Sequence, residues 1–182
     1  MMKAKLVGFI GPATRVSSRY PDSDQSMPAK YARAIAAYRA VDIKAALTLT
    51  QQLIEADPSN PYFEELKGQI LFESNKAIES IEPHRKSVEL APQHALLKVN
   101  LARSLIGTKT DANVDEAEGL LLQASRLHGS GRFQLEAAVQ SAHAVRRRTG
   151  RSDWAAIEGL YDALLARTGS PVVALNRAVA LA

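Results

Sequence analysis

The sequence contains no cysteine and few aromatic residues, and these absences exclude several classes of protein. Without cysteine, a chain of 182 residues has no disulfide framework and no thiolate metal site. Aromatic residues make up only 5% of the chain, whereas 46% of it is hydrophobic and much of that is alanine. This composition favours helices that pack closely over a β-sandwich, so we expect an all-α protein.

A long apolar run and a large excess of one charge are also absent. The apolar stretch near the N-terminus, Leu6 to Ile10, is too short for the core of a signal peptide or for a membrane span. The net charge of +4 is mildly basic and well below that of a dedicated nucleic-acid binder. We therefore expect a soluble, cytoplasmic protein with no membrane span and no nucleic-acid partner.

The residues that build catalytic sites do not occur in catalytic patterns. The four histidines are scattered, and no two of them are spaced four apart as zinc ligands on one helix would be: His84, His94, His128 and His143. A nucleophile motif of the G-x-S-x-G type is also missing. The sequence predicts no enzyme, no metal and no cofactor.

Two prolines in matching settings set the period of the chain. Pro58 follows Glu55-Ala56-Asp57, and Pro92 follows Glu89-Leu90-Ala91, which is 34 residues further on. A period of 34 residues is typical of the tetratricopeptide (TPR) repeat, a helix hairpin that stacks into a solenoid with a concave binding surface. The small residues Ala34, Gly68 and Ala102 recur at matching positions, where paired helices approach closely.

We therefore predict a TPR-like right-handed helical-hairpin solenoid of about nine helices; a generic helical bundle is the alternative. The predicted parts are an irregular segment over 1–27, three helix pairs over 28–127, a junction at 128–131 and a TPR-like tail over 132–182. The tail ends in an unpaired helix, whose Leu175, Val179 and Leu181 predict self-association through an apolar surface.

Two stretches near the N-terminus and one in the second hairpin carry a family resemblance. They are Arg19-Tyr20-Pro21-Asp22-Ser23-Asp24, Pro28-Ala29-Lys30-Tyr31-Ala32-Arg33-Ala34, and Asn60-Pro61-Tyr62-Phe63-Glu64-Glu65-Leu66-Lys67-Gly68-Gln69. Residues 1–127 thereby resemble the C-terminal TPR tail of bacterial zinc metalloproteases of the β-barrel assembly-enhancing protease family. The resemblance implies a periplasmic or membrane-associated location if the chain belongs to a longer protease. The H-E-x-x-H zinc helix of that family is absent here.

Residues 132–182 resemble a different family. Phe133-Gln134-Leu135-Glu136-Ala137-Ala138, Asp153-Trp154, Leu160-Tyr161-Asp162-Ala163-Leu164 and Ser170-Pro171-Val172-Val173-Ala174-Leu175-Asn176-Arg177-Ala178-Val179 are similar to the helical tail of a group of extracytoplasmic-function sigma factors. The chain then reads as two helical-repeat fragments joined near His128 to Gly131, either as an engineered chimera or as a natural fusion.

The first helix of each pair lines the groove of a TPR solenoid, and the repeat offsets place nine candidates for peptide binding there. They are Tyr31, Ile35, Tyr38, Glu65, Gln69, Phe72, Val99, Asn100 and Arg103. We expect apolar contact from Tyr38 and Phe72, and polar anchoring by Asn100 and Arg103. The alternative is that Arg103 is a solvated surface residue and the aromatic residues belong to the core.

The densest run of positive charge consists of Arg146, Arg147, Arg148 and Arg151. It would suit phosphate or an acidic partner, but a basic helix end that faces water is favoured, because no aromatic residues are interleaved with it. The sequence thus favours a non-catalytic scaffold that binds a peptide or protein segment. The alternatives are the tail of a TPR-containing zinc metalloprotease without its catalytic domain and, less favoured, a regulatory module related to sigma factors.

Overall fold

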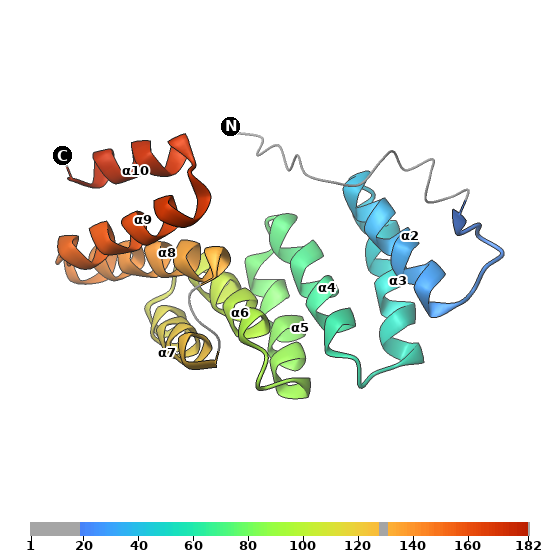
Figure 1. The fold of residues 1–182 in the computed structure, drawn as a ribbon. Helices are drawn as coiled ribbons and strands as arrows, with labels where there is room; N and C mark the ends of the chain where they lie inside the picture. Colours follow the sequence, from blue (N-terminus) through green and yellow to red (C-terminus); the bar gives the residue numbers. More distant parts are fainter. Residues whose placement is uncertain (1–18, 128–130, 182) are drawn as a thin grey trace. The chain divides into compact units, whose positions relative to one another are not determined.

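The computed structural model describes residues 19–127 and 131–181, apart from the side chains of Arg147, Arg148 and Leu181. Contacts divide the chain into two compact units, one ending at Pro58 and the other beginning at Ser59. Figure 1 shows that the described residues form helices and connecting turns, with no strand among them. The predicted irregular segment 1–27 lies largely outside the described residues, since only its last part, from Arg19, is included.

The first unit contains one helix pair, α2 (Met27–Arg39) and α3 (Ile43–Ala56). The second unit contains three further pairs and a last single helix. These are α4 (Pro61–Glu73) with α5 (Ala77–Leu90), α6 (Ala95–Gly107) with α7 (Asp111–Leu127), α8 (Arg132–Thr149) with α9 (Trp154–Thr168), and α10 (Pro171–Leu181). The described residues thus hold nine helices, as the sequence predicts.

Local sequence explains where these helices begin and end. The side chains of Ser26, Asp42, Asn60 and Asp153 each accept a hydrogen bond from a main-chain N–H in the first turn of the helix that follows. Pro61 occupies the start of α4, where its missing N–H has no cost. After α8 and α9, Gly150 and Gly169 take the left-handed conformation that ends a helix.

The turn inside each of the first three hairpins repeats the same backbone conformation. Val41, Asn75 and Lys109 have positive φ values of 64°, 63° and 61°, and they are spaced by the 34-residue period. A positive φ is uncommon for residues other than glycine and costs most for a β-branched residue such as Val41. The repeat is therefore present in the backbone even where the side chains differ. The turn between α8 and α9 breaks the spacing and uses Gly150 instead.

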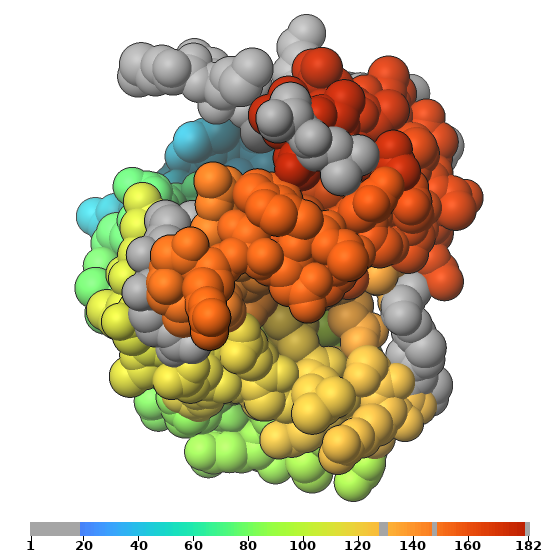
Figure 2. All heavy atoms as spheres, turned by 90° about the vertical axis from the view of Figure 1, so that its left-hand side faces the viewer, coloured from blue at the N-terminus to red at the C-terminus, as the bar shows by residue number. Residues whose placement is uncertain are grey.

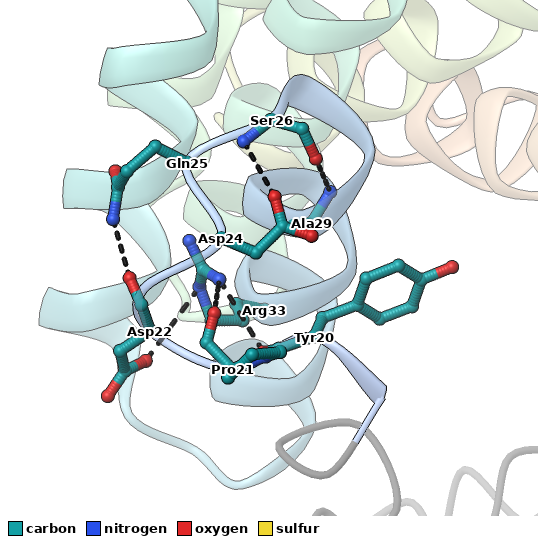
Figure 3. Close-up of polar contacts among 8 residues, drawn as sticks. All are labelled: Tyr20, Pro21, Asp22, Asp24, Gln25, Ser26, Ala29 and Arg33. Carbon is teal, nitrogen blue, oxygen red and sulfur yellow. Dashed lines mark hydrogen bonds and ion pairs between the residues drawn. The ribbon is translucent and has the colours of Figure 1, made fainter.

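In the first unit, one arginine fixes the chain that precedes α2. Arg33 donates from Nη1 to the carbonyl oxygen of Pro21 at 2.6 Å, and its Nε lies 3.9 Å from Asp22 Oδ1 (Figure 3). The sequence has Arg33 where the TPR motif usually has leucine. The structure gives the reason: the guanidinium binds main-chain carbonyls of the segment that folds back over α2.

In the second unit, the first helices of successive pairs are neighbours. Helix α6 contacts α4 on one side and α8 on the other, and it also packs against α5 and α7. The core beneath it is built from buried leucines and alanines of α6 and α7, including Leu101, Leu105, Ala117 and Leu121. Figure 2 shows the face of this unit where α8 (orange) lies against the yellow segments of α6 and α7. One side of α4, α6 and α8 can therefore form a single surface.

The predicted junction at 128–131 stays a prediction, because residues 128–130 are outside the described part of the chain. Within residues 19–127 and 131–181, no helix combines the length and apolar character needed to cross a bilayer.

Candidate protein-binding site

Three of the predicted groove residues on α4 and α6 form one hydrogen-bonded cluster. Asn100 Nδ2 donates to Glu65 Oε1 at 2.9 Å, and Arg103 Nη1 lies 3.5 Å from Asn100 Oδ1. Burial raises the pKa of Glu65, while the hydrogen bond from Asn100 and the charge of Arg103 act in the opposite direction. Asn100 is only 5% exposed. The amide therefore serves first as an internal bridge between the two helices.

Phe72 belongs to the same surface. The guanidinium carbon of Arg103 lies 5.0 Å from the centre of the Phe72 ring, a cation–π contact that keeps the arginine over α4. Gln69, one turn earlier on α4, donates to Glu73 of the same helix. The structure thus brings together the predicted residues of α4 and the polar residues of α6 on one surface.

The structure corrects the prediction that Val99 lines the groove. Its side chain is 2% exposed and belongs to the core cluster between α6 and α7, so it does not line an open groove. The repeat offset gives the correct helix but not the correct face, because one step along a helix turns a residue by about 100°.

Behind this surface lies a buried polar group that the sequence analysis did not single out. His84 of α5 is 1% exposed, and its Nδ1 lies 2.8 Å from Ser104 Oγ, which in turn lies 2.8 Å from Ser80 Oγ. Burial and the positive charge of Arg103 lower the pKa of His84 to about 4, against a weaker opposite effect from the main chain of Glu65. The imidazole is therefore neutral at pH 7.

Gly68 allows this histidine to sit against α4. A Cβ placed on Gly68 would lie 2.4 Å from His84 Cδ2 and 2.5 Å from its Nε2. Glycine at this repeat position is thus required by the ring that packs on it, as the expected close approach of paired helices implies.

An open pocket of about 590 Å³ lies between the end of α6 and α8. Its six lining residues come from α6 and the turn after it, and from one face of α8: Ile106, Gly107, Lys109, Gln140, His143 and Arg146. The three residues of α8 are spaced three apart, so they share one face of the helix. The pocket adjoins the part of α6 that carries Arg103, one turn before Ile106 and Gly107.

Aromatic residues of α9 position two of the side chains that line the pocket. The guanidinium carbon of Arg146 lies 4.7 Å from the ring centre of Trp154, and His143 Nε2 lies 3.4 Å from the hydroxyl of Tyr161. Burial raises the pKa of Tyr161, so its hydroxyl is protonated at neutral pH. The pocket wall on α8 is thus supported from behind by the second helix of the same pair.

That the basic run forms one patch stays a prediction. Arg146 lines the pocket, and Arg151 lies beyond Gly150 and is exposed. The side chains of Arg147 and Arg148 lie outside the described part of the structure. Lys109, His143 and Gln140 were missed by the sequence analysis. The helical spacing of Gln140, His143 and Arg146 was the available signal, but their meeting with Lys109 depends on how α8 packs on α6.

The groove candidates of the first unit share one helix, α2. Tyr31 is 37% exposed, and Ile35 and Tyr38 are half-buried, so all three keep some surface accessible. They lie at the helical spacing predicted from the sequence, on the unit that ends at Pro58. Their participation in a binding surface stays a prediction.

Helix α10 has the apolar exposure that the sequence suggests. Leu175 and Val179 are 64% and 69% exposed, and Val172 on the same helix is 63% exposed. The helix is held to α9 by Arg177, whose guanidinium donates to Asp162 at 2.6 Å and to Glu158 at 2.7 Å. Self-association through this surface stays a prediction, and the side chain of Leu181 lies outside the described residues.

The part of the chain that the structure describes contains no group of three or more histidine, aspartate or glutamate side chains placed to hold a metal ion. His84, His94 and His143 lie on different helices or helix ends, and His128 is outside the described residues.

Comparison with known proteins identifies the fold but not the activity. No protein-family model matches the sequence. The uncharacterized protein R00370 from Rhizobium meliloti (strain 1021) is 31% identical over 136 residues, which are 75% of this chain but 30% of that protein. The chain therefore spans about a third of the length of this relative.

Two solved structures share the architecture. A thermophilic TPR protein from Thermus thermophilus, TTC0263, superimposes with a TM-score of 0.71, at 14% identity, over 93% of this chain and 88% of that one. MamA MSR-1 C2 superimposes with a TM-score of 0.58, at 16% identity, over 73% and 75% of the two chains. These similarities confirm the prediction of an all-α, TPR-like fold built from helical hairpins.

Proposed function

We propose that this protein is a non-catalytic scaffold that binds a peptide or protein segment on the surface formed by α4, α6 and α8. TPR hairpins stack so that their first helices share one face, and extended surfaces of this kind hold other chains. The observation that carries the proposal is that α6 shares the Glu65–Asn100–Arg103 cluster with α4 at one end and the open pocket with α8 at the other.

A peptide array tests this function directly. The wild-type protein should select a limited set of peptides, and Arg103→Ala should weaken that set because it removes the guanidinium over Phe72. Lys86→Ala is the matched control, since Lys86 is an exposed cation paired with Glu89 at 3.1 Å on α5, which is not one of the helices of the proposed surface. Equal binding of all peptides by all three proteins would end the proposal.

A second candidate is that the chain is the partner-holding part of a longer protein, such as the tail of a TPR-containing zinc metalloprotease. The observation that favours it is the length of the Rhizobium meliloti relative, of which the matched region makes up 30%. The test is to look in the gene for an upstream segment with an H-E-x-x-H helix. Zinc-dependent cleavage by the 182-residue chain alone would contradict both candidates.

The resemblance of residues 132–182 to a sigma-factor tail remains a hypothesis of its own. It predicts that the chain co-purifies with RNA polymerase, and a failure to co-purify would count against it.

A further inference from the structure

The pocket between α6 and α8 has a chemical character that differs from the rest of the surface. None of its six lining residues is acidic, and Lys109 and Arg146 carry positive charge. Two full positive charges around one open pocket of about 590 Å³ favour an anionic ligand. The two cations repel each other, and a bound anion lowers this repulsion because it attracts both.

Lys109 and Arg146 are not neutralised by any of the residues that the structure describes. In the described part of the chain, no ion pair joins Lys109 or Arg146 to a carboxylate, in contrast to the pairs formed by Arg85 with Glu116 and by Arg177 with Asp162 and Glu158. Arg146 instead lies over the ring of Trp154, which holds the guanidinium in place and leaves its charge unpaired.

The apolar part of the pocket comes from the end of α6. Ile106 and Gly107 form this side, and Gly107 packs so tightly that a Cβ there would lie 3.1 Å from Phe72 Cε2 and from Ala77 Cβ. A ligand therefore meets both apolar surface and cations. His143 is the one lining residue with a ring, and no phenylalanine, tyrosine or tryptophan lines the pocket, so it lacks the series of aromatic side chains on which successive nucleic-acid bases stack.

From these observations we infer that the pocket binds an acidic segment of a protein partner, with its carboxylates facing Lys109 and Arg146 and its aliphatic atoms against Ile106. The inference rests on the proposed function and names the chemistry of the ligand. The volume of the pocket lies in the usual range for binding pockets, about 300–1,000 Å³, and suits a few side chains rather than a folded domain. Partner specificity then comes from charge complementarity.

Fluorescence anisotropy with short labelled peptides tests the inference. The probes are a peptide of alternating glutamate and alanine, its glutamine counterpart and its lysine counterpart. We expect the glutamate peptide to bind, the other two to bind at least about tenfold more weakly, and salt to weaken the glutamate complex. The double variant Lys109→Gln/Arg146→Gln should lose about tenfold or more in affinity, whereas Lys86→Gln should bind as the wild type does.

A charge-reversed variant makes the test independent of any general loss of binding. Lys109→Glu/Arg146→Glu should prefer the lysine peptide, which a misfolded or inactive protein would not do. Unchanged affinity of the double glutamine variant for the glutamate peptide would overturn the inference. Tighter binding of a labelled single-stranded oligonucleotide that depends on the same two residues would also overturn it, in favour of nucleic acid.

The peptide array separates this inference from the proposed function. If Arg103→Ala loses the selected peptides while the double glutamine variant keeps them, the scaffold function stands and the pocket inference falls. If neither variant changes the selected set, both fall.

Discussion

Two neighbouring regions of the same surface differ in whether their charged side chains are paired. Between α4 and α6, the carboxylate of Glu65 is bridged by Asn100 to Arg103, and the arginine also lies over Phe72. Between α6 and α8, Lys109 and Arg146 face an open pocket and have no acidic partner in the described residues. Charges that satisfy one another stabilise the fold, whereas charges without a partner remain available to a ligand.

The contrast extends into the core. The first region is backed by a fully buried polar group, His84 with Ser104 and Ser80, packed on Gly68. The pocket is backed by Trp154 and Tyr161 of α9, which support its side chains from behind. We therefore expect substitutions in the first region to change stability, and substitutions in the pocket to change binding.

The largest effect is expected for Gly68→Ala. The new Cβ would lie 2.4 Å from the ring of His84, which cannot easily move because its Nδ1 is held by Ser104. Overpacking of this kind should lower the free energy of unfolding by about 3 kcal/mol, measured by urea denaturation. Removing the ring with His84→Ala in the same protein should recover part of the loss, as the coupling of two touching residues requires.

Gly119→Ala is the matched control for that substitution. Gly119 is an exposed glycine of α7, and a Cβ added to it would have no atom within 4 Å, so alanine should raise helix stability by about 0.5–1 kcal/mol. Equal effects of the two substitutions would contradict the close approach of His84 to α4.

The free energy of unfolding should depend on pH because the pKa of the buried His84 imidazole is lowered on folding. The pKa of His84 is lowered from 6.5 to about 4 on folding, so the unfolded chain binds more protons between these values. The corresponding stability is fully present above about pH 6.5 and is lost as pH falls toward 4, by up to roughly 3 kcal/mol. His84→Phe should flatten the urea-unfolding profile over this range.

Glu65 has to be considered in the same experiment. Burial raises its pKa, so its contribution is present at low pH and is lost as pH rises through the folded value, opposite in sign to that of His84. Because Glu65 is present in both proteins, its contribution cancels when the pH profile of His84→Phe is subtracted from that of the wild type. A pH profile that His84→Phe leaves unchanged between pH 6.5 and 4 would argue against a neutral buried ring.

A smaller effect is expected for Asn100→Ala. This substitution leaves the half-buried Glu65 without its amide donor and should cost about 1–2 kcal/mol in urea unfolding. Glu65→Gln, which keeps an acceptor for Asn100, should be close to neutral. If Asn100→Ala leaves stability unchanged, the amide serves no internal purpose and is fully available for a ligand.

The smallest effect separates stability from binding at one residue. Lys109 has φ 61°, so Lys109→Gly should relieve backbone strain and stabilise the turn by about 0.5–1 kcal/mol, as should Val41→Gly at the matching turn. Binding of the glutamate peptide should nevertheless weaken, because a cation of the pocket is lost. Asn75→Gly should change little, since asparagine tolerates this conformation. Tighter peptide binding by Lys109→Gly would contradict the role of this charge.

Much of the fold could be predicted from the sequence because the signals are local. Pro58 and Pro92 give the period, the small residues Gly68 and Ala102 give the close helix crossings, and the caps Asn60 and Asp153 give helix starts. Such signals act over one or two helical turns, so they survive without knowledge of the tertiary contacts.

The candidate site could be predicted only in part. The repeat offset placed Glu65, Phe72, Asn100 and Arg103 on the correct helices, but it assigned the buried Val99 to the groove. It also missed the pocket, because Lys109 and His143 are far apart in the sequence and belong to different hairpins. Their approach depends on how α8 packs against α6, which no short sequence pattern encodes.

The sequence by itself determined that this protein is a series of helical hairpins, because hydrophobic spacing, helix caps and the 34-residue period are properties of the chain read locally. The tertiary structure alone decided which charged side chains are paired within the protein and which face a pocket without a carboxylate. Glu65 meets Asn100 and Arg103 only when α4 and α6 pack together, whereas Lys109 and Arg146 converge on a pocket with no carboxylate among its lining residues to neutralise them. Electrostatic pairing depends on distance in space, and that distance is set by helix packing rather than by position along the chain.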